Sequence, residues 1–220
     1  MPDVVDLSHV IAHGTVTYPG LPGPVIGDHL SREASRERYA PGYEFQIGRI
    51  EMVSNTGTYL DTPFHRFPDG HDLAGLDPAR VAAVPGVVVD ASGGPAEIGP
   101  AALDGVAVAG AAVLFRTGWD RHWATDRYGE QGHPYLAAAT ASALAGAGAA
   151  VVGIDSVNID GTATGERPVH TALLAAGVPI VEHLCNLDAI GGRAFTFFAV
   201  PPAVSGMGTF PVRALAVLTA

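Results

Sequence analysis

The chain contains no lysine, and positive charge is scarce throughout its 220 residues. Its 12 basic residues are all arginines and stand against 22 Asp and Glu, which gives a formal net charge of -10. A surface that follows a phosphate backbone needs clustered positive charge, and the arginines form no such cluster. We therefore expect no nucleic-acid partner.

Cysteine and long apolar runs are equally sparse. The lone Cys185 cannot form an internal disulfide; it could be a nucleophile, although a small buried apolar side chain is the more common role. No apolar run reaches the roughly 18 residues that a membrane-spanning helix requires. The N-terminal residues 1–6 lack the positive segment of a secretory signal. The sequence thus predicts no membrane partner and a reducing, cytoplasmic setting.

The remaining composition is typical of a globular protein. Apolar residues make up 48% of the chain and charged residues 15%, which is enough for one core in a single domain over residues 1–220. Strand patterns alternate with helix patterns in the second half, whereas the first half has strands and few helices. This order predicts an α/β or mixed α+β fold. We expect strands at 4–11, 44–53, 84–90, 111–118, 150–155, 178–182, 194–200 and 212–218, and helices at 134–146 and 169–176.

Residues 54–66 form a candidate chemical centre, which we expect to be a stiff loop following the strand at 44–53. The stretch carries an acid and a base four residues apart, Asp61 and His65, with Pro63 restricting the backbone between them. Loops of this kind often carry catalytic groups. On its own, however, the stretch is explained as well by an Asp that caps a turn and a His at the surface.

A second candidate centre lies more than a hundred residues later. Pro168 suits the first turn of a helix, which places His170 near the helix N-terminus, where the dipole favours a neutral imidazole. Glu182 ends a predicted buried strand, where an unpaired acid is costly. Side chains alternate along a strand, so we expect Glu182 and His183 to point in opposite directions, and only one of them to share a site with His170.

Together these motifs resemble the cyclase family of metal-dependent hydrolases, which includes kynurenine formamidases and isatin hydrolases. The resemblance covers nearly the whole chain and implies a swivelling β/β/α fold and assembly as homodimers or larger oligomers. The motifs that carry it are Thr56-Gly57-Thr58-x-x-Asp61-x-Pro63-x-His65, His170 with Glu182, Asp6-Leu7-Ser8-His9, Tyr18-Pro19-Gly20, Arg116-Thr117-Gly118 and the closing Pro211-Val212-Arg213-Ala214.

The chain departs from the family at two metal-binding histidines. The family motif reads His-x-Gly-Thr-His-x-Asp-x-Pro-x-His, and here Asn55 and Tyr59 stand in place of its first two histidines. Neither residue replaces an imidazole as a zinc ligand. The resemblance therefore implies that one ion site is lost and the other survives as Asp61, His170 and Glu182. We expect one divalent ion, Zn²⁺ or Mn²⁺, rather than two.

The resemblance implies a hydrolase that attacks an amide, ester or lactone carbonyl of a small aromatic or cyclic substrate with metal-activated water. His65 matches the catalytic histidine and would act as general acid and base. Tyr59 could donate to the developing oxyanion. Asn55 and Tyr18 would contact the substrate, Tyr18 by stacking.

Two other classes of function remain open. One is a metal-free acid–base enzyme, such as a dehydratase, cyclase or isomerase of secondary metabolism, in which Asp61 orients His65. The other is a non-catalytic protein that binds a small molecule. His9, Asp155 and Asn158 could lie near the pocket or serve structural roles, and the histidines expected at the surface are His13, His29, His71, His122 and His133.

Overall fold

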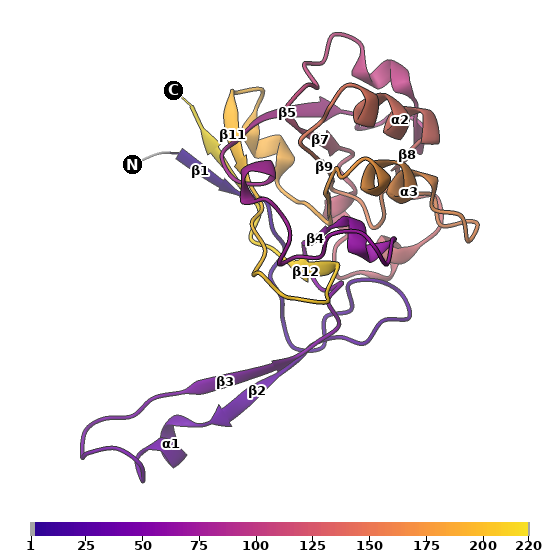
Figure 1. Ribbon diagram of the computed structural model, residues 1–220. Helices are drawn as coiled ribbons and strands as arrows, with labels where there is room; N and C mark the ends of the chain where they lie inside the picture. Colours follow the sequence, from indigo (N-terminus) through magenta and orange to yellow (C-terminus); the bar gives the residue numbers. More distant parts are fainter. Residues whose placement is uncertain (1–2, 220) are drawn as a thin grey trace.

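The computed structural model describes residues 3–219, and nine strands distributed along this segment form one mixed sheet. The sheet order is β1-β13-β11-β5-β7-β9-β10-β4-β12, and the sheet curls so that β1 and β12 lie at its two edges (Figure 1). Its centre, from β5 through β10, is parallel, while the remaining pairs are antiparallel. The sheet strands are β1 Asp3–Asp6, β4 Tyr59–Asp61, β5 Val84–Asp90, β7 Ala112–Arg116, β9 Val151–Ile154, β10 Ile180–Glu182, β11 Phe195–Phe198, β12 Thr209–Pro211 and β13 Leu215–Leu218.

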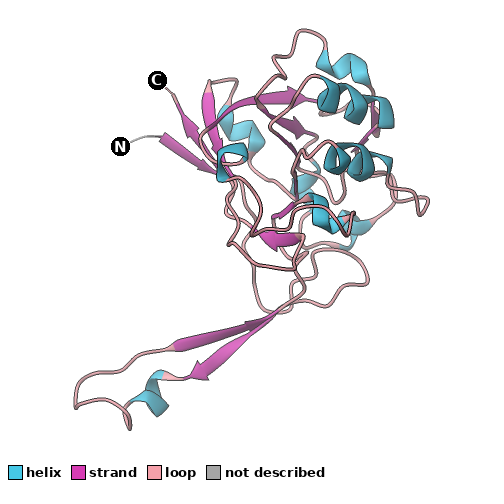
Figure 2. Ribbon diagram, viewed as in Figure 1, coloured by secondary structure: helices cyan, strands magenta, loops and turns pink. Residues whose placement is uncertain are grey.

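The α-helices α2 and α3 cover one face of the sheet (Figure 2). They pack against each other and supply Leu144 and Leu173 to the core on that side. Alternation along β7 sends Val113 and Phe115 to this helical core. The α-helices are α1 Arg32–Ser35, α2 Ala138–Gly146 and α3 Pro168–Ala175, and the 3-10 helices are Pro63–His65, Pro78–Arg80, Pro100–Leu103, Trp119–His122, Asp126–Gly129 and Leu187–Ile190.

The short strand β4 determines which polar groups reach the helical side. Leu60 packs into the core on the opposite face, so its neighbours Tyr59 and Asp61 point toward the helices. β4 lies between β10 and β12, with Asp61 directly opposite Ile180 on one side and Thr209 on the other. Residues from three distant parts of the chain therefore meet at β4.

A hairpin arm, residues 25–51, projects from this body (Figure 1). It consists of β2 Val25–Leu30, α1 and β3 Ile47–Glu51, and its two strands pair only with each other. A further two-stranded sheet pairs β6 Glu97–Ile98 with β8 Tyr135–Leu136. Within residues 3–219, no helix is both long and apolar enough to cross a lipid bilayer.

The predicted mixed α+β class is confirmed, and several boundaries are corrected. Residues 59–61, expected to be loop, form β4, because strands from the C-terminal half pair with both of its edges. The helix expected from residue 134 begins only at Ala138, since Tyr135 and Leu136 form β8. The strand expected at 44–53 is β3 of the exposed arm and lies outside the main sheet.

Candidate active site

Two acids and one imidazole converge on the helical side of β4 and β10. Nε2 of His170 lies 3.8 Å from Oδ2 of Asp61 and 3.6 Å from Oε1 of Glu182. All three side chains are buried. The sheet register explains the meeting, because Asp61 pairs with Ile180 and the next residue on the same face of β10 is Glu182.

Asp160 fixes the orientation of the His170 imidazole through its Nδ1 atom. Its carboxylate accepts hydrogen bonds from the backbone N–H groups of Val169 and His170, 2.7 and 3.0 Å away, and so caps the first turn of α3. The same carboxylate lies 2.7 Å from Nδ1 of His170. Because a carboxylate only accepts, Nδ1 carries the proton of that bond, and Nε2 faces the two acids. A second carboxylate that orients a ligating imidazole is common in metal sites.

His65 stands at the open side of the cluster. It follows β4 in the 3-10 turn Pro63–His65, and its side chain is 36% exposed. Its Nδ1 lies 2.8 Å from the hydroxyl of Thr209, and that hydroxyl lies 2.5 Å from Oδ1 of Asp61. The hydroxyl must donate to the ionised Asp61, so it accepts from Nδ1–H of His65. Nε2 of His65 then keeps a free lone pair.

Tyr59 and Glu182 are joined directly. The Tyr59 hydroxyl lies 2.6 Å from Oε2 of Glu182, while Oε1 of Glu182 accepts from the backbone N–H of Ile159 at 2.6 Å. His183 also reaches the Tyr59 hydroxyl, with Nε2 3.3 Å away. The expectation that Glu182 and His183 point in opposite directions is wrong. His183 takes a left-handed backbone conformation, φ 56°, which ends the strand alternation at Glu182.

The charges in the cluster determine its proton affinities. Burial alone would lower the pKa of His170, but Glu182, Asp160 and Asp61 surround it and raise that pKa to about 10. Burial likewise opposes ionisation of Asp61, yet the His170 and His65 imidazoles lower the pKa of Asp61 overall. The prediction that the helix dipole keeps His170 neutral is therefore wrong for the ion-free site. The nearby carboxylates outweigh the helix terminus.

The residues present fit a divalent cation. Asp61, His65 and His170 each offer a ligand atom, and these atoms all lie within 4.8 Å of one another. Oδ2 of Asp61 is buried and has no hydrogen-bond partner among residues 3–219. A buried anionic oxygen without a partner is costly, and a cation between it and Nε2 of His170 would remove that cost. One carboxylate and two imidazoles are suitable ligands for zinc or manganese, and Glu182, with Oε1 3.6 Å from Nε2 of His170, offers a second carboxylate beside them.

The two residues predicted to contact the substrate lie on separate segments. Asn55 is half-buried, accepts a hydrogen bond from the Ser54 hydroxyl and lies near Tyr59, whose pKa burial raises well above its usual value. Tyr18 is half-buried, and its neighbours Thr17 and Pro19 line a cavity of about 670 Å³.

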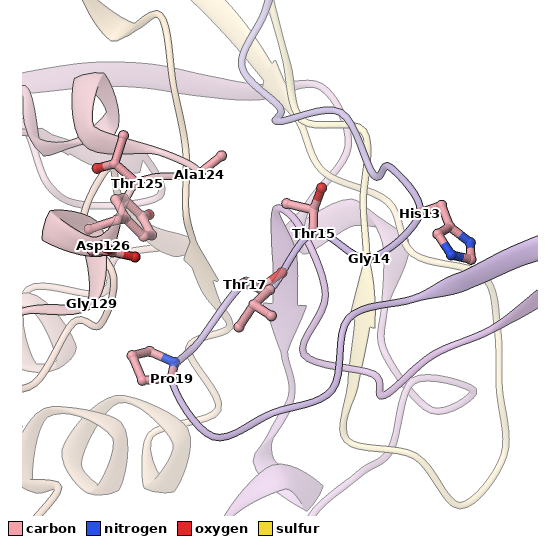
Figure 3. A pocket seen from close by; sticks show the side chains of 11 residues that line it. His13, Gly14, Thr15, Thr17, Pro19, Ala124, Thr125, Asp126 and Gly129 are labelled. Carbon is pink, nitrogen blue, oxygen red and sulfur yellow. The ribbon is translucent and has the colours of Figure 1, made fainter.

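Figure 3 shows this cavity between the N-terminal loop, with Thr15 and Thr17, and the segment that carries Thr125 and Asp126. Thr17 ties the loop to the β4 segment, because its hydroxyl accepts from the backbone N–H of Gly57 at 2.7 Å. The lining includes Tyr128 but none of the acid–imidazole cluster. The cavity therefore lies beside the cluster rather than around it.

Other candidates from the sequence have structural roles. Asp155 accepts from the Thr117 and Gly118 backbones and stabilises a turn, and Asn158 accepts from Asp160 N–H. Burial raises the pKa of the Cys185 thiol to about 12, which favours the role of a small buried apolar side chain over that of a nucleophile. The surface placement of His133 is wrong: it is 1% exposed, because Thr162 and Ser156 lie within hydrogen-bond distance of its ring and enclose it.

His9 is half-buried and its ring stacks on Trp123, with centroids 4.0 Å apart and planes 5° apart. Burial lowers the pKa of His9 to about 4. The stack therefore holds a neutral imidazole.

Three functional neighbours were missed in the sequence. Thr209 sits in the expected gap between two C-terminal strands, and only the pairing of β12 with β4 brings it to Asp61. Asp160 lies too far before Pro168 for a capping pattern to reveal its contact with the first turn of α3. Tyr128 is 3% exposed, and nothing in the polar sequence around it indicates this burial.

Comparison with known proteins gives consistent matches over most of the chain. Residues 5–161 match the Cyclase family, described as "Putative cyclase". A kynurenine formamidase from Bacillus cereus is 28% identical over 215 residues, which span 96% of this chain and 95% of that protein. Isatin hydrolase A from Ralstonia solanacearum has a similar structure, with a TM-score of 0.82 at 24% identity over 99% of this chain and 92% of that one. A "predicted metal-dependent hydrolase" from Bacillus stearothermophilus aligns with a TM-score of 0.76 at 25% identity over 98% of both chains.

Proposed function

This chain belongs to the cyclase family, and from that premise we propose that it is a metal-dependent hydrolase of a non-peptide C–N bond in a small aromatic or cyclic amide. The names of two relatives, a kynurenine formamidase and an isatin hydrolase, support that bond type. The observation that carries the proposal is the buried Oδ2 of Asp61, which has no hydrogen-bond partner in the described part of the chain and lies 3.8 Å from Nε2 of His170.

Asp61, His170 and Glu182 would hold the ion. His170 is suited to this role because Asp160 occupies its Nδ1 and leaves Nε2 for a ligand bond. An ion bound there would lower the pKa of a coordinated water toward about 7 and polarise the substrate carbonyl. A second ion is not proposed, because the amide of Asn55 and the protonated phenol of Tyr59 are weak ligands.

His65 would move the proton. Its Nδ1–H is held by Thr209, so Nε2 is the free base, and the exposed part of the ring can meet a substrate. Nε2 would accept a proton from the attacking water and then deliver it to the nitrogen that leaves the carbonyl carbon. General acid–base transfer of this kind typically contributes about 10²–10⁴-fold to the rate.

The test combines metal analysis with turnover. Purified protein should contain about one Zn²⁺ or Mn²⁺ per chain, and removal by a chelator should abolish hydrolysis of a formylated kynurenine, isatin or related aryl amides until the ion is restored. Activity that survives complete metal removal but is lost in His65→Ala would establish the metal-free acid–base enzyme instead. A metal-bearing or metal-free protein that turns over no amide, ester or lactone would favour the binding protein.

A substitution at Glu182 tests whether this residue is a metal ligand. Glu182→Gln keeps the size of the side chain but removes its charge, so metal content and turnover should both fall at least 10-fold. Asp69→Asn makes the same kind of change at an exposed acid outside the cluster and serves as the matched control. Metal content equal in the two variants would refute Glu182 as a ligand.

A further inference from the structure

Two arginines, Arg66 and Arg167, line one cavity of about 690 Å³ at the surface. Within residues 3–219, five arginines form ion pairs with carboxylates, and these two are not among them. Acids outnumber basic residues by 22 to 12, so a shortage of acids does not explain why both lack a carboxylate partner. Two such guanidinium groups in one cavity suit a negatively charged ligand.

The cavity lies at the junction of the two segments that carry the histidines of the cluster. At this junction the rings of His65 and His170 have centroids 6.0 Å apart. One residue further along each segment, Nε of Arg66 lies 3.4 Å from the hydroxyl of Thr171. That hydroxyl donates to the carbonyl of Arg167 at 2.7 Å, so one side chain joins both arginines. The lining includes no acid or imidazole of the cluster, and the cavity therefore lies beside it.

Contacts with the protein restrain both arginine side chains. The Arg66 guanidinium lies over the Phe67 ring, 5.3 Å from its centroid. Nη1 of Arg167 donates to the carbonyl oxygens of Thr164 and Glu166 at 2.9 and 2.7 Å. Both Nη atoms of Arg66, and Nε and Nη2 of Arg167, form no hydrogen bond with the described residues. These free N–H groups can bind the two oxygens of a carboxylate.

The rest of the lining indicates what the ligand carries besides its charge. Ala138, Pro168 and Ala172 supply apolar surface from α2 and α3. Glu166 adds one exposed carboxylate, whose repulsion is weaker for a ligand of charge −1 than for one of charge −2. A small organic carboxylate, with an apolar part and a single charge, therefore fits this lining better than a phosphate does.

We propose that the cavity binds a small organic carboxylate, with its oxygens on Arg66 and Arg167 and its apolar part against Ala138 and Ala172. Hydrolysis of an amide breaks the C–N bond, transfers the oxygen of water to the acyl carbon, and gives an amine and a carboxylic acid that ionises. The proposed reaction therefore produces a ligand of this kind, and the cavity holds the acid product beside the cluster. The product role rests on the proposed function, whereas carboxylate binding does not.

The test is a titration of benzoate into the native protein at low ionic strength, where surface charges are least screened. Calorimetry should show binding. In NMR spectra of ¹⁵N-arginine-labelled protein, the Nε–H signals of Arg66 and Arg167 should move, which distinguishes this cavity from a carboxylate bound at an ion in the cluster. Benzamide, which has the same shape without the charge, should bind at least 10-fold more weakly.

Four variants locate the site. Arg66→Gln and Arg167→Gln should each lower the benzoate affinity about 10-fold, which corresponds to one charge-assisted hydrogen bond. Glu166→Gln removes the opposing charge and should raise the affinity about 2–5-fold. Arg80→Gln removes an exposed arginine outside the cavity and is the matched control, which should bind benzoate as the native protein does.

The outcomes separate this proposal from the proposed function. Equal benzoate affinities in Arg66→Gln, Arg167→Gln and Arg80→Gln would overturn the site, and so would benzamide binding as tight as that of benzoate. Inorganic phosphate bound more tightly than benzoate would overturn the carboxylate as the ligand. A native protein that binds benzoate through both arginines but turns over no amide would overturn the hydrolase and the product role, and would support the carboxylate site.

Discussion

Asp160 serves two purposes with one carboxylate: it caps α3 and it orients His170. The N–H groups of Val169 and His170 and the Nδ1 of His170 all bond to its two oxygens. The position of α3 and the orientation of the His170 imidazole therefore both depend on the Asp160 carboxylate. A shift of α3 relative to Asp160 would also turn the imidazole.

Asp160→Ala should therefore weaken both stability and metal binding. Loss of the cap should cost about 1 kcal/mol of unfolding free energy, and loss of the orienting partner should weaken Zn²⁺ binding about 10–100-fold. Denaturant unfolding and titration calorimetry measure the two effects. Asp77→Ala removes a comparable cap on the 3-10 helix Pro78–Arg80, so it should lower stability and spare the affinity. Equal affinities would show that Asp160 acts on the helix alone.

Individual residues also mark what the sequence could predict. Spacing and the family resemblance named Asp61, His65, His170 and Glu182, and these four lie together in the structure. The direction of the His183 side chain could not be predicted, because strand alternation assumes an extended backbone. The sequence does not indicate the left-handed conformation, φ 56°, at this residue.

At the scale of elements, β4 depends on its neighbours more than on its own residues. Three residues are too few for a pattern to predict a strand, and only the pairing with β10 and β12 creates one. The fold class followed from longer elements such as β5 and α3, whose apolar runs are local signals. Thr209 could not be linked to Asp61 in advance, because the contact joins segments 148 residues apart.

The turn after β4 is fixed by a close approach of two backbones. A Cβ at Gly208 would lie 2.6 Å from Cα of His65 and 2.8 Å from the carbonyl carbon of Phe64, far inside ordinary contact distance. The absence of a side chain at Gly208 therefore sets the position of His65 relative to the cluster.

Gly208→Ala should displace the 3-10 turn that carries His65. Overpacking of this kind costs about 1–3 kcal/mol, and the rate constant for turnover should fall more than the affinity for Zn²⁺, because His65 moves while the ligand residues stay. Gly146→Ala, at the end of α2 with nothing within 4 Å of the new methyl, is the control and should retain full turnover. An unchanged turnover rate in Gly208→Ala would mean that the turn accommodates the added methyl group without displacing His65.

At the scale of the whole molecule, the hairpin arm carries a group of exposed apolar side chains. Tyr39, Tyr43 and Phe45 are 42%, 63% and 52% exposed, which for aromatic side chains amounts to roughly 300 Å². Ile26 and Ile50 face each other across the two strands and add to it. A hairpin of two strands is marginally stable alone in water. The arm also carries four arginines against five acids, so it is nearly neutral beside a strongly acidic body.

We expect the arm to bind a second copy of the chain, in line with the expected homo-oligomer. The double variant Phe45→Ser with Ile47→Ser should lower the molecular mass measured by sedimentation equilibrium to that of one chain, because it removes apolar contact area. The double variant Glu37→Ser with Arg38→Ser changes exposed polar residues on the same arm and should keep the mass of the native protein. A native protein that already sediments as one chain would contradict the expectation.

The position of β4 between two C-terminal strands has a consequence for synthesis on the ribosome. A nascent polypeptide that stops before Thr209 already holds every acid and imidazole of the cluster, yet it lacks the hydroxyl that joins Asp61 to His65. It also leaves β4 as an open edge, where unpaired N–H and C=O groups invite aggregation. Translation must therefore pass β12 before the Asp61–Thr209–His65 contact can form, and a fragment released before that point would expose the edge of β4 and be prone to self-association.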